Sequence, residues 1–265
     1  MTTIMNGQDW RAAGEAWGSR ANDWSCLYEH YSVDVLFAIL GRVAAPRSDL
    51  LDIACGSGLA VRLAAGMGAR TAGIDASEEL VAVGRERTPA ADLRVGSMYE
   101  LPWPTESFDA AISISGIWGG CEPALDEAFR VLRPGGLIAI SFWGQGPPLD
   151  IGKFFRVFAI HSPNAQRKSM RSLNDIATPG VAEGMLARSG FTVLERDSRI
   201  SVIEFPDDEL AWRAISTLGP AVPALRTNDN DILRREVFDA LASCRDNRGI
   251  YRVRGDQQFV IARKP

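Results

Sequence analysis

Short apolar runs alternate with amphipathic helical stretches through the first half of the chain. Leu50, Leu51 and Ile53, and the segment 110–115, are apolar enough for strands buried on both faces, and further strands are predicted at 70–75, 93–98 and 137–142. Helical spacing of apolar residues occupies the segments between them, at 33–43, 59–67 and 125–132. This alternation favours an α/β fold built around a parallel sheet.

The pattern changes beyond residue 150. Helical periodicity is found at 151–160, 181–189, 207–218 and 231–242. Strand-like segments lie at 191–205 and 251–263. The last two strands are therefore expected to be separated by a helical insertion, residues 206–246. Because loops and insertions carry specificity more often than the scaffold does, we expect this insertion to cover a substrate.

Tryptophan recurs every seven residues near the N-terminus, at Trp10, Trp17 and Trp24. This spacing places the three side chains close to one face of a helix. Gly14 and Gly18 weaken that helix, so we expect a broken or mobile one within an N-terminal helical cap, residues 1–45. The cap has two interpretations, a hydrophobic seam packed on the core or a lid over a ligand site.

Glycines follow the first strand and predict a tight turn into a helix. Gly56 and Gly58 lack Cβ atoms, so the chain can bend sharply and a ligand can lie against bare backbone. The free N–H groups of the next helix attract an anionic group. The dinucleotide fingerprint G-x-G-x-x-G fails, since its third glycine falls on Val61. A nicotinamide-dependent oxidoreductase is therefore the disfavoured alternative.

The second predicted strand ends in Asp75, at the edge of the sheet where doubly wound folds bind their ligands. A carboxylate there can accept hydrogen bonds from both hydroxyls of a ribose, and such bonds are charge-assisted. The alternative makes Asp75 only a residue at the start of the helix that follows Ser77. Together with the glycine turn, the ribose role is favoured.

The turn fits the pattern acidic-x-small-x-Gly-x-Gly, which resembles the first motif of class I S-adenosylmethionine (SAM)-dependent methyltransferases. Later strings resemble the ubiquinone and menaquinone biosynthesis subgroup (methyltransferase type 11). They are Leu101-Pro102-Trp103-Pro104 with Ser107-Phe108-Asp109, and Ala128-Phe129-Arg130-Val131-Leu132-Arg133-Pro134-Gly135-Gly136. The second string is expected to end a helix and turn the chain. The resemblance covers about residues 45–145.

The resemblance implies a Rossmann-like, seven-stranded sandwich with an antiparallel last strand, and SAM as the cofactor. The turn would wrap the methionyl end, with Trp17 and Arg20 of the cap approaching it. Ser97 stands where the family usually has an aspartate for the adenine amino group, so a weaker contact is expected there. The residues that the resemblance assigns to the cofactor are Trp17, Arg20, Asp52, Ala54, Cys55, Gly56, Gly58, Asp75, Ala76, Leu80, Ser97, Met98 and Ser115.

Candidate catalytic residues come from outside these motifs. His161 follows a cluster of phenylalanines at 154–158, which could line an apolar substrate pocket with His161 as a general base. The alternative is a plain core with a structural histidine. Tyr28 and His30 could polarise a substrate hydroxyl, or they could be partly exposed surface residues.

Composition bounds the class of protein. The chain has 265 residues, 46% of them hydrophobic and 23% charged, as in ordinary globular proteins. A net charge of −4 without a basic run disfavours nucleic acid as a partner. We find no secretion signal and no apolar run long enough to span a bilayer. The four cysteines have no metal-binding spacing, so we expect no metal and reduced thiols in a cytoplasm.

The resulting hypothesis is a single methyltransferase domain over residues 1–265, with core segments 46–205 and 247–265. It would transfer a methyl group from SAM to a small organic acceptor. Arginine greatly outnumbers lysine, which hints at a GC-rich genome and specialised metabolism. The alternative is a SAM-fold cyclase or binding protein that transfers no methyl group. Monomer and homodimer both remain open.

Overall fold

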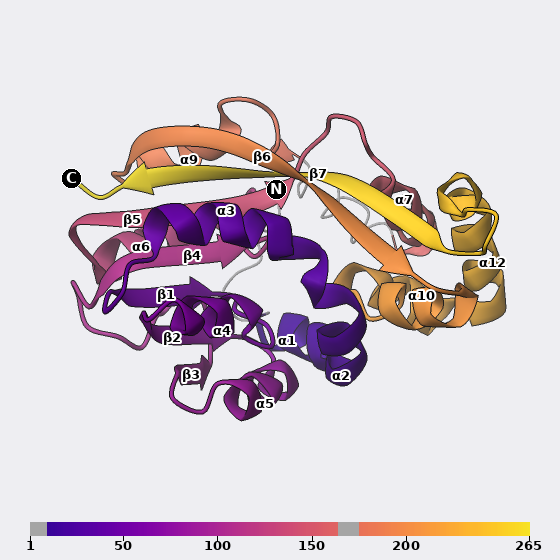
Figure 1. The fold of residues 1–265 in the computed structure, drawn as a ribbon, viewed down its shortest axis with the longest axis horizontal. Helices are drawn as coiled ribbons and strands as arrows, with labels where there is room; N and C mark the ends of the chain where they lie inside the picture. Colours follow the sequence, from indigo (N-terminus) through magenta and orange to yellow (C-terminus); the bar gives the residue numbers. More distant parts are fainter. Residues whose placement is uncertain (1–9, 164–174) are drawn as a thin grey trace.

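Seven strands form one mixed sheet in the computed structural model, which describes residues 10–163 and 175–265 (Figure 1). The strand order is β3-β2-β1-β4-β5-β7-β6. Strands β1 to β5 are parallel, and β7 is antiparallel to both β5 and β6. The strands are β1 (Asp49–Ile53), β2 (Arg70–Asp75), β3 (Asp92–Val95), β4 (Phe108–Ile114), β5 (Leu132–Trp143), β6 (Thr192–Phe205) and β7 (Tyr251–Arg263). The predicted seven-stranded α/β fold is confirmed.

Helices precede, connect and follow the strands much as the periodicity predicts. They are α1 (Trp10–Gly18), α2 (Ala21–Asp23), α3 (Val33–Val43), α4 (Leu59–Gly66), α5 (Glu78–Arg87), α6 (Glu122–Val131), α7 (Ile151–His161), α9 (Val181–Arg188), α10 (Asp208–Ile215), α11 (Val222–Thr227) and α12 (Asn230–Leu241). Three of these, α10 to α12, lie between β6 and β7, where the insertion was expected. No helix within the described ranges is long and apolar enough to cross a membrane.

Neighbouring residues of each central strand face opposite layers of helices. Leu50 of β1 packs with α3 and α4, whereas Leu51 packs with α6 and α9 on the other face. Ala110 and Ala111 of β4 divide in the same way. Because side chains alternate across a strand, a sheet covered on both faces needs apolar residues at consecutive positions. This requirement explains the uninterrupted apolar runs.

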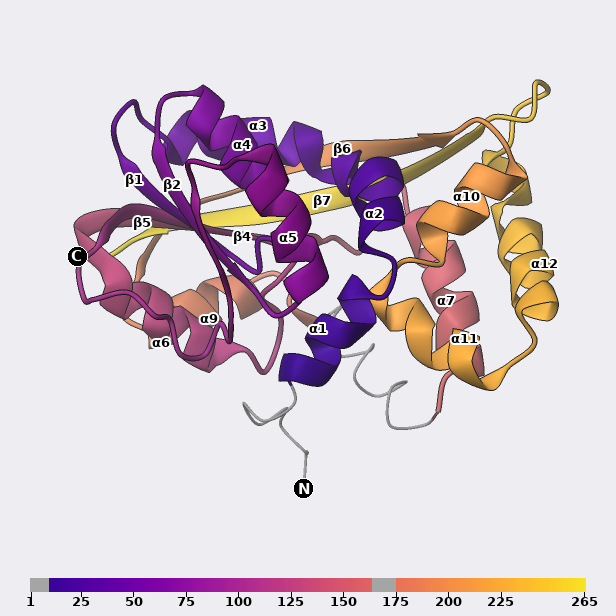
Figure 2. The ribbon, with the colours of Figure 1, turned by 90° about the horizontal axis from the view of Figure 1, so that it is seen from below.

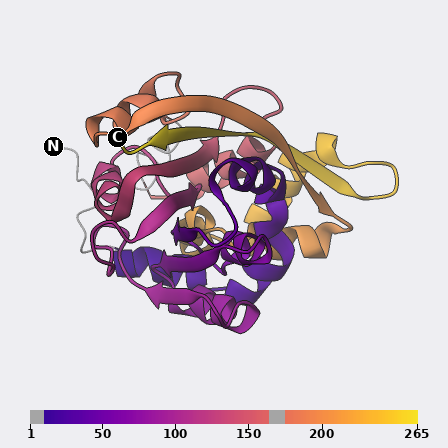
Figure 3. The same ribbon diagram turned by 60° about the vertical axis from the view of Figure 1, so that its left-hand side comes forward.

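A second core lies beyond the end of the sheet, where β6 and β7 continue past their neighbours (Figure 3). The far ends of these strands, at Phe205 and Tyr251, pack with α7 and with α10 to α12. Phe154 and Phe158 of α7 are fully buried in this core. Of the two interpretations of the phenylalanine cluster, the plain core therefore applies to these two side chains.

Strand β5 begins earlier than predicted. The segment 133–136 was expected to form a turn, but it belongs to the strand. The backbone N–H of Gly135 donates to the Lys264 carbonyl over 2.9 Å, and the N–H of Lys264 donates to the Gly136 carbonyl over 2.9 Å. These bonds to the residue after β7 draw the segment into the sheet, although Gly135 keeps a φ of 80°.

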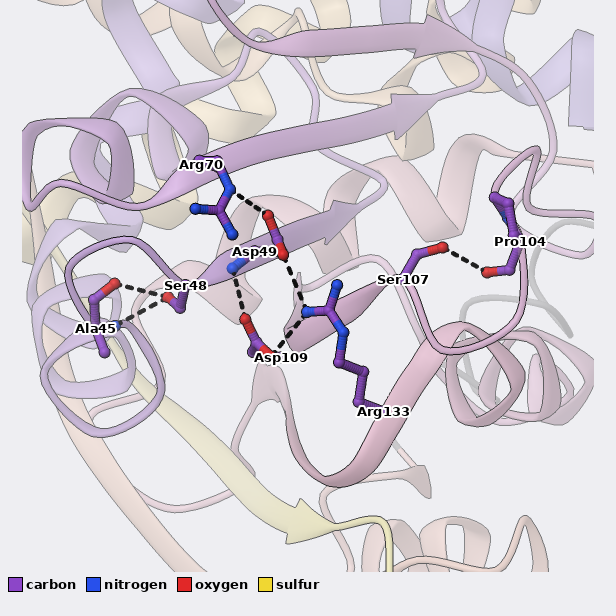
Figure 4. A network of polar contacts seen from close by, with 8 residues as sticks. All are labelled: Ala45, Ser48, Asp49, Arg70, Pro104, Ser107, Asp109 and Arg133. Atoms are coloured by element: carbon purple, nitrogen blue, oxygen red, sulfur yellow. Dashed lines mark hydrogen bonds and ion pairs between the residues drawn. The ribbon is translucent and has the colours of Figure 1, made fainter.

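Arg133 lies at the amino-terminal edge of the sheet, where it forms ion pairs that the sequence did not predict (Figure 4). Its Nη1 lies 3.0 Å from Asp49 Oδ2 and 2.8 Å from Asp109 Oδ1. Arg70 Nε lies 2.6 Å from the other oxygen of Asp49. Four strands are thus joined by ion pairs at the edge opposite to the glycine turn.

The N-terminal helix is broken, as predicted, after Gly18. A π-helical turn at Trp24–Tyr28 and a 3₁₀ turn at Glu29–Ser32 follow α2, and α3 then packs on the sheet. We therefore keep the word cap for residues 10–32. Figure 2 shows the cap between α5 and the insertion helices.

The two cap glycines have a further cause that the sequence did not reveal. A Cβ atom on Gly14 would overlap the carbonyl oxygen of Ala76, and one on Gly18 would overlap the Ser77 hydroxyl and the Glu79 carboxylate. Glycine is needed at both positions because α1 passes directly over the junction between β2 and α5.

Candidate functional site

The chain after β1 turns with three residues in the left-handed region of φ. Ala54, Gly56 and Gly58 have φ values of 61°, 53° and 77°. Glycine adopts this conformation without steric cost, whereas Ala54 adopts it under strain. No side chain caps α4, which starts after Gly58, so its first backbone N–H groups have no side-chain acceptor. The turn can therefore present bare backbone donors to a ligand.

Asp75 at the end of β2 is joined to this turn. Its Oδ2 accepts a hydrogen bond from the Gly56 N–H over 2.8 Å, and its Oδ1 accepts one from the Ser77 N–H over 2.9 Å. The Ala76 N–H is a third backbone donor, and a carboxylate has about four acceptor positions, so one remains for a ligand. Ser77 precedes α5 as its N-terminal capping residue, and its hydroxyl accepts a hydrogen bond from Leu80 N over 3.1 Å. Burial raises the pKa of Asp75, against the lowering effect of its backbone donors.

Asp52 lies in β1 beneath the turn and is 2% exposed. Its Oδ1 has no hydrogen-bond partner within the described part of the chain. Burial, and after it the charge of Asp75, holds the pKa of Asp52 well above its ordinary value. A buried acceptor without a donor is costly, so this atom indicates a missing polar partner at the turn. Cys55 is also buried, and its sulfur packs against Gly73 of β2.

The cap contacts the turn through Trp24. The indole ring lies against Gly56, where a Cβ atom would come within 3.0 Å of Trp24 Cη2. Trp17 meets Trp24 edge to face, with ring centroids 6.4 Å apart, and packs on Gly219 of the insertion. Arg20 donates to the Ser216 hydroxyl, also in the insertion. Of Trp10, Trp17 and Trp24, it is therefore Trp24 that contacts the turn, and the sequence did not reveal this.

The residues assigned to the adenine lie along the next strand tips. Gly96 N donates to the Asp75 carbonyl over 2.9 Å, which keeps the exit of β3 beside β2. The Ser97 hydroxyl accepts from Tyr99 N over 3.1 Å and can still donate. Met98 is half-buried and Leu80 is buried, while Ala76 faces Gly14 of the cap. The adenine roles of these residues stay predictions.

A polar and aromatic group surrounds Ser115 at the carboxyl end of β4. Ser115 has a φ of 55°, and its hydroxyl lies 3.4 Å from Gln257 Nε2 and is hydrogen-bonded to Tyr31. The Tyr31 ring lies 5.2 Å from the rings of both Tyr28 and Trp143, measured between centroids. The Tyr28 hydroxyl is buried and has no partner among the described residues, and burial raises its pKa well above the ordinary value.

His161 lies apart from this group, whereas His30 adjoins Tyr31 in the chain. His30 is exposed on the surface of the cap. His161 ends α7, and its Nε2 lies 2.7 Å from Glu236 Oε2 of α12. The structure thus brings together the turn, Asp75, Ser115 and Tyr28, and places His161 in the insertion half.

A cleft of about 710 Å³ opens elsewhere, between the cap and the outer face of α5. It is lined by cap residues 18–23 and by Glu79, Ala82, Val83 and Glu86. Leu80, which is assigned to the adenine, is not part of its wall. Within the described ranges, no group of three or more His, Cys, Asp or Glu side chains could hold a metal ion.

Comparison with known proteins gives consistent matches. A family model described as a methyltransferase domain matches residues 51–140. A protein of Mycolicibacterium smegmatis, described as a probable S-adenosylmethionine-dependent methyltransferase, is 30% identical over 225 residues, which cover 78% of this chain and 84% of the relative. The ubiquinone/menaquinone biosynthesis C-methyltransferase of Methylobacterium nodulans is 33% identical over 54% of this chain and 65% of its own length.

Solved structures share the fold at low identity. One described as a methyltransferase of Bacillus halodurans is 18% identical, with a TM-score of 0.59 over 88% of this chain and 98% of its own. The [4+2]-cyclase SpnF is 17% identical, with a TM-score of 0.59 over 100% of this chain and 96% of its own. At such identities the likeness concerns the fold alone.

Proposed function

Because the chain belongs to the S-adenosylmethionine-dependent methyltransferases, we propose that it transfers a methyl group from SAM to a small organic acceptor bound beneath the cap. The observation that carries the proposal is the pair formed by the glycine turn and Asp75. These are the two elements that the fold offers for a nucleoside, and a direct hydrogen bond joins them.

The residues of the turn fit the cofactor. The unpartnered Oδ1 of Asp52 and the free N–H groups at the start of α4 leave polar capacity for the methionyl end. The remaining acceptor position of Asp75 suits a ribose hydroxyl. Leu80, Ser97 and Met98 would surround the adenine. When bound, SAM supplies a methyl group that its sulfonium sulfur has already activated.

The protein then has to align the acceptor and exclude water. We place the acceptor at the group around Ser115. Tyr28 is buried and Tyr31 half-buried, and both phenols have raised pKa values, so both stay neutral and can hold an acceptor by hydrogen bonds. Trp143 supplies an aromatic wall to the same group. Trp17 and Arg20 would fix the cap over this site through their contacts with the insertion.

His161 is the proposed general base only for a hydroxyl acceptor that extends into the insertion half, because it lies apart from the group around Ser115. Its partner Glu236 would orient the imidazole, as carboxylates do for catalytic histidines. His30 is the second candidate, because it is exposed and free to approach a substrate. Neither is required if the acceptor is an amine or a thiolate.

The other classes considered are less well supported. A nicotinamide-dependent oxidoreductase is not favoured, since the family relatives are methyltransferases. The likeness to a cyclase is one of fold alone and gives no support to cyclisation. A cytoplasmic location and a specialised pathway stay predictions, as does the single domain over residues 1–265.

Binding and transfer are tested with the purified full chain. Calorimetric titration should show binding of SAM and none of NAD, and the Asp75→Ala variant is the control for the site. Incubation with SAM labelled on its methyl group and a small-molecule cell extract should then yield a labelled product. Tight binding of SAM without any labelled product would contradict methyl transfer and favour the non-transferring alternative.

A further inference from the structure

Ser57 lies in the middle of the glycine turn, between Gly56 and Gly58, and is fully buried. Its side chain contacts two charged groups, the Glu29 carboxylate and the Arg87 guanidinium. The Ser57 hydroxyl donates a hydrogen bond to the Glu29 carboxylate, and it accepts one from Arg87 Nη1 over 3.1 Å. Ser57 therefore links the glycine turn to Glu29 of the cap and to Arg87 of α5.

Glu29 and Arg87 form an ion pair that joins the cap to α5. The Glu29 side chain is 6% exposed and that of Arg87 is 22% exposed. Arg87 also donates to the Ser25 carbonyl over 3.0 Å. Three segments thus meet at one buried carboxylate: the cap, the turn and the end of α5.

This arrangement is poorly explained by stability alone. A buried ion pair often contributes little net stability, because both charges lose their hydration, but it fixes the geometry of what it joins. Here the joined parts are the glycine turn, through Ser57, the cap, and the carboxyl-terminal end of α5, through Arg87. A shift of the turn by a fraction of an ångström would misplace the Gly56 N–H.

We propose that Glu29 is a positioning residue for the cofactor: it acts through Ser57 to hold the glycine turn in the geometry that binds SAM, and Arg87 holds Glu29 in place. The inference rests on the placement of SAM at the turn that is proposed above. On this proposal the cap supports the cofactor site through the hydrogen bond between Glu29 and Ser57, in addition to the contact of Trp24 with Gly56.

The test measures the affinity for S-adenosylhomocysteine, the demethylated cofactor, by calorimetry in the full chain. Ser57→Ala removes the link and leaves the ion pair, whereas Glu29→Gln keeps the shape and removes the charge. Each variant should bind about tenfold more weakly, the equivalent of one charge-assisted hydrogen bond. The double variant should also lose only about tenfold, because residues that act through one contact are not additive.

Glu183→Gln is the matched control. Glu183 pairs with Arg196, whose side chain is 22% exposed like that of Arg87, but this pair joins α9 to β6. The control should lower the melting temperature and leave the affinity for S-adenosylhomocysteine unchanged, which separates positioning from general destabilisation.

Three results would overturn the inference: full affinity in Ser57→Ala, full affinity in Glu29→Gln, or an additive loss of about a hundredfold in the double variant. If Glu29→Gln does not fold, Ser57→Ala decides alone. The site itself is judged separately by Asp75→Ala. Weak binding in that variant with full affinity in Ser57→Ala would leave the proposed function standing and remove only the role of Glu29.

Discussion

The carboxylate of Asp75 accepts a hydrogen bond, 2.8 Å long, from the backbone N–H of Gly56. The tip of β2 therefore holds the turn that follows β1, and the two features that indicate a cofactor site form one unit. Asp75 is a structural part of the turn as well as the proposed ligand of the ribose. Its loss should for this reason affect both halves of the bound cofactor.

Replacement of Asp75 by alanine should weaken binding of SAM by about 1.5–3 kcal/mol, because charge-assisted hydrogen bonding to the ribose is lost. Titration calorimetry measures this change. Asp207→Ala is the control, since Asp207 also precedes a helix and accepts from Leu210 N over 2.8 Å. It should cost about 1 kcal/mol of stability and leave SAM binding intact. Unchanged affinity in Asp75→Ala would remove the ribose assignment.

Gly14→Ala should destabilise the protein by about 1–3 kcal/mol, because the added Cβ overlaps the Ala76 carbonyl oxygen and forces α1 away from α5. Gly41→Ala is the matched substitution inside α3, where nothing lies within 4 Å of the new atom. It should stabilise the protein by about 0.5–1 kcal/mol through helix propensity. Thermal unfolding compares the two, and equal effects would refute the close approach of the cap.

Asp49→Asn should destabilise the protein at neutral pH by about 1–2 kcal/mol and progressively less in acid. Arg70, by its hydrogen bond, and Arg133 hold the pKa of Asp49 below its ordinary value. The carboxylate therefore stabilises the fold above the unfolded pKa of about 3.9, and this contribution is lost as the pH falls through the folded pKa. The difference between the melting temperatures of the variant and the native chain should narrow below about pH 4. A constant difference would contradict the ionic role.

Ser97→Asp should raise the affinity for SAM about fivefold, because a charged acceptor binds the adenine amino group more strongly than a neutral hydroxyl. The new carboxylate can keep the bond to Tyr99 N that the Ser97 hydroxyl now accepts. Ser97→Ala provides the comparison and should bind more weakly than the native chain. An order of affinity in which aspartate does not exceed serine would place the adenine elsewhere.

His161→Gln should lower the rate of methyl transfer about a hundredfold if a hydroxyl acceptor is deprotonated by this residue, with SAM affinity unchanged. Glu236→Gln should lower the rate of transfer less than His161→Gln does, because the carboxylate acts only by orienting the imidazole. Labelled transfer to the active extract fraction supplies both measurements. Native rates in His161→Gln would assign the residue to packing between α7 and α12.

Local pattern accounts for most of the fold. The bounds of β2 agree with the strand predicted at 70–75, and the turn at 54–58 was recognisable from two glycines after a buried strand. The pattern failed where distant partners decide the structure. The segment 133–136 contains proline and glycine yet joins β5, because Lys264 pairs with it from the other end of the chain.

The same limit applies to the site. Asp75 was identifiable because a strand-end carboxylate has a recognisable position. Trp24 and Glu29 were not, because their contacts with Gly56 and Ser57 depend on how the broken cap folds back over the turn. The glycines at 14 and 18 were read only as weak helix formers, although they mark the place of closest approach.

The ion pairs of Arg133 with Asp49 and Asp109 lie at the amino-terminal edge of the sheet, opposite to the edge where the substrate is proposed to bind. A protein engineer could therefore exchange helices α10 to α12 for those of another enzyme, or build libraries in them, without disturbing the fastening of the strands. The ion pairs that stabilise the sheet and the residues that select the substrate thus lie at opposite edges. Related enzymes can therefore change the substrate-binding edge during evolution while they keep the stabilising ion pairs.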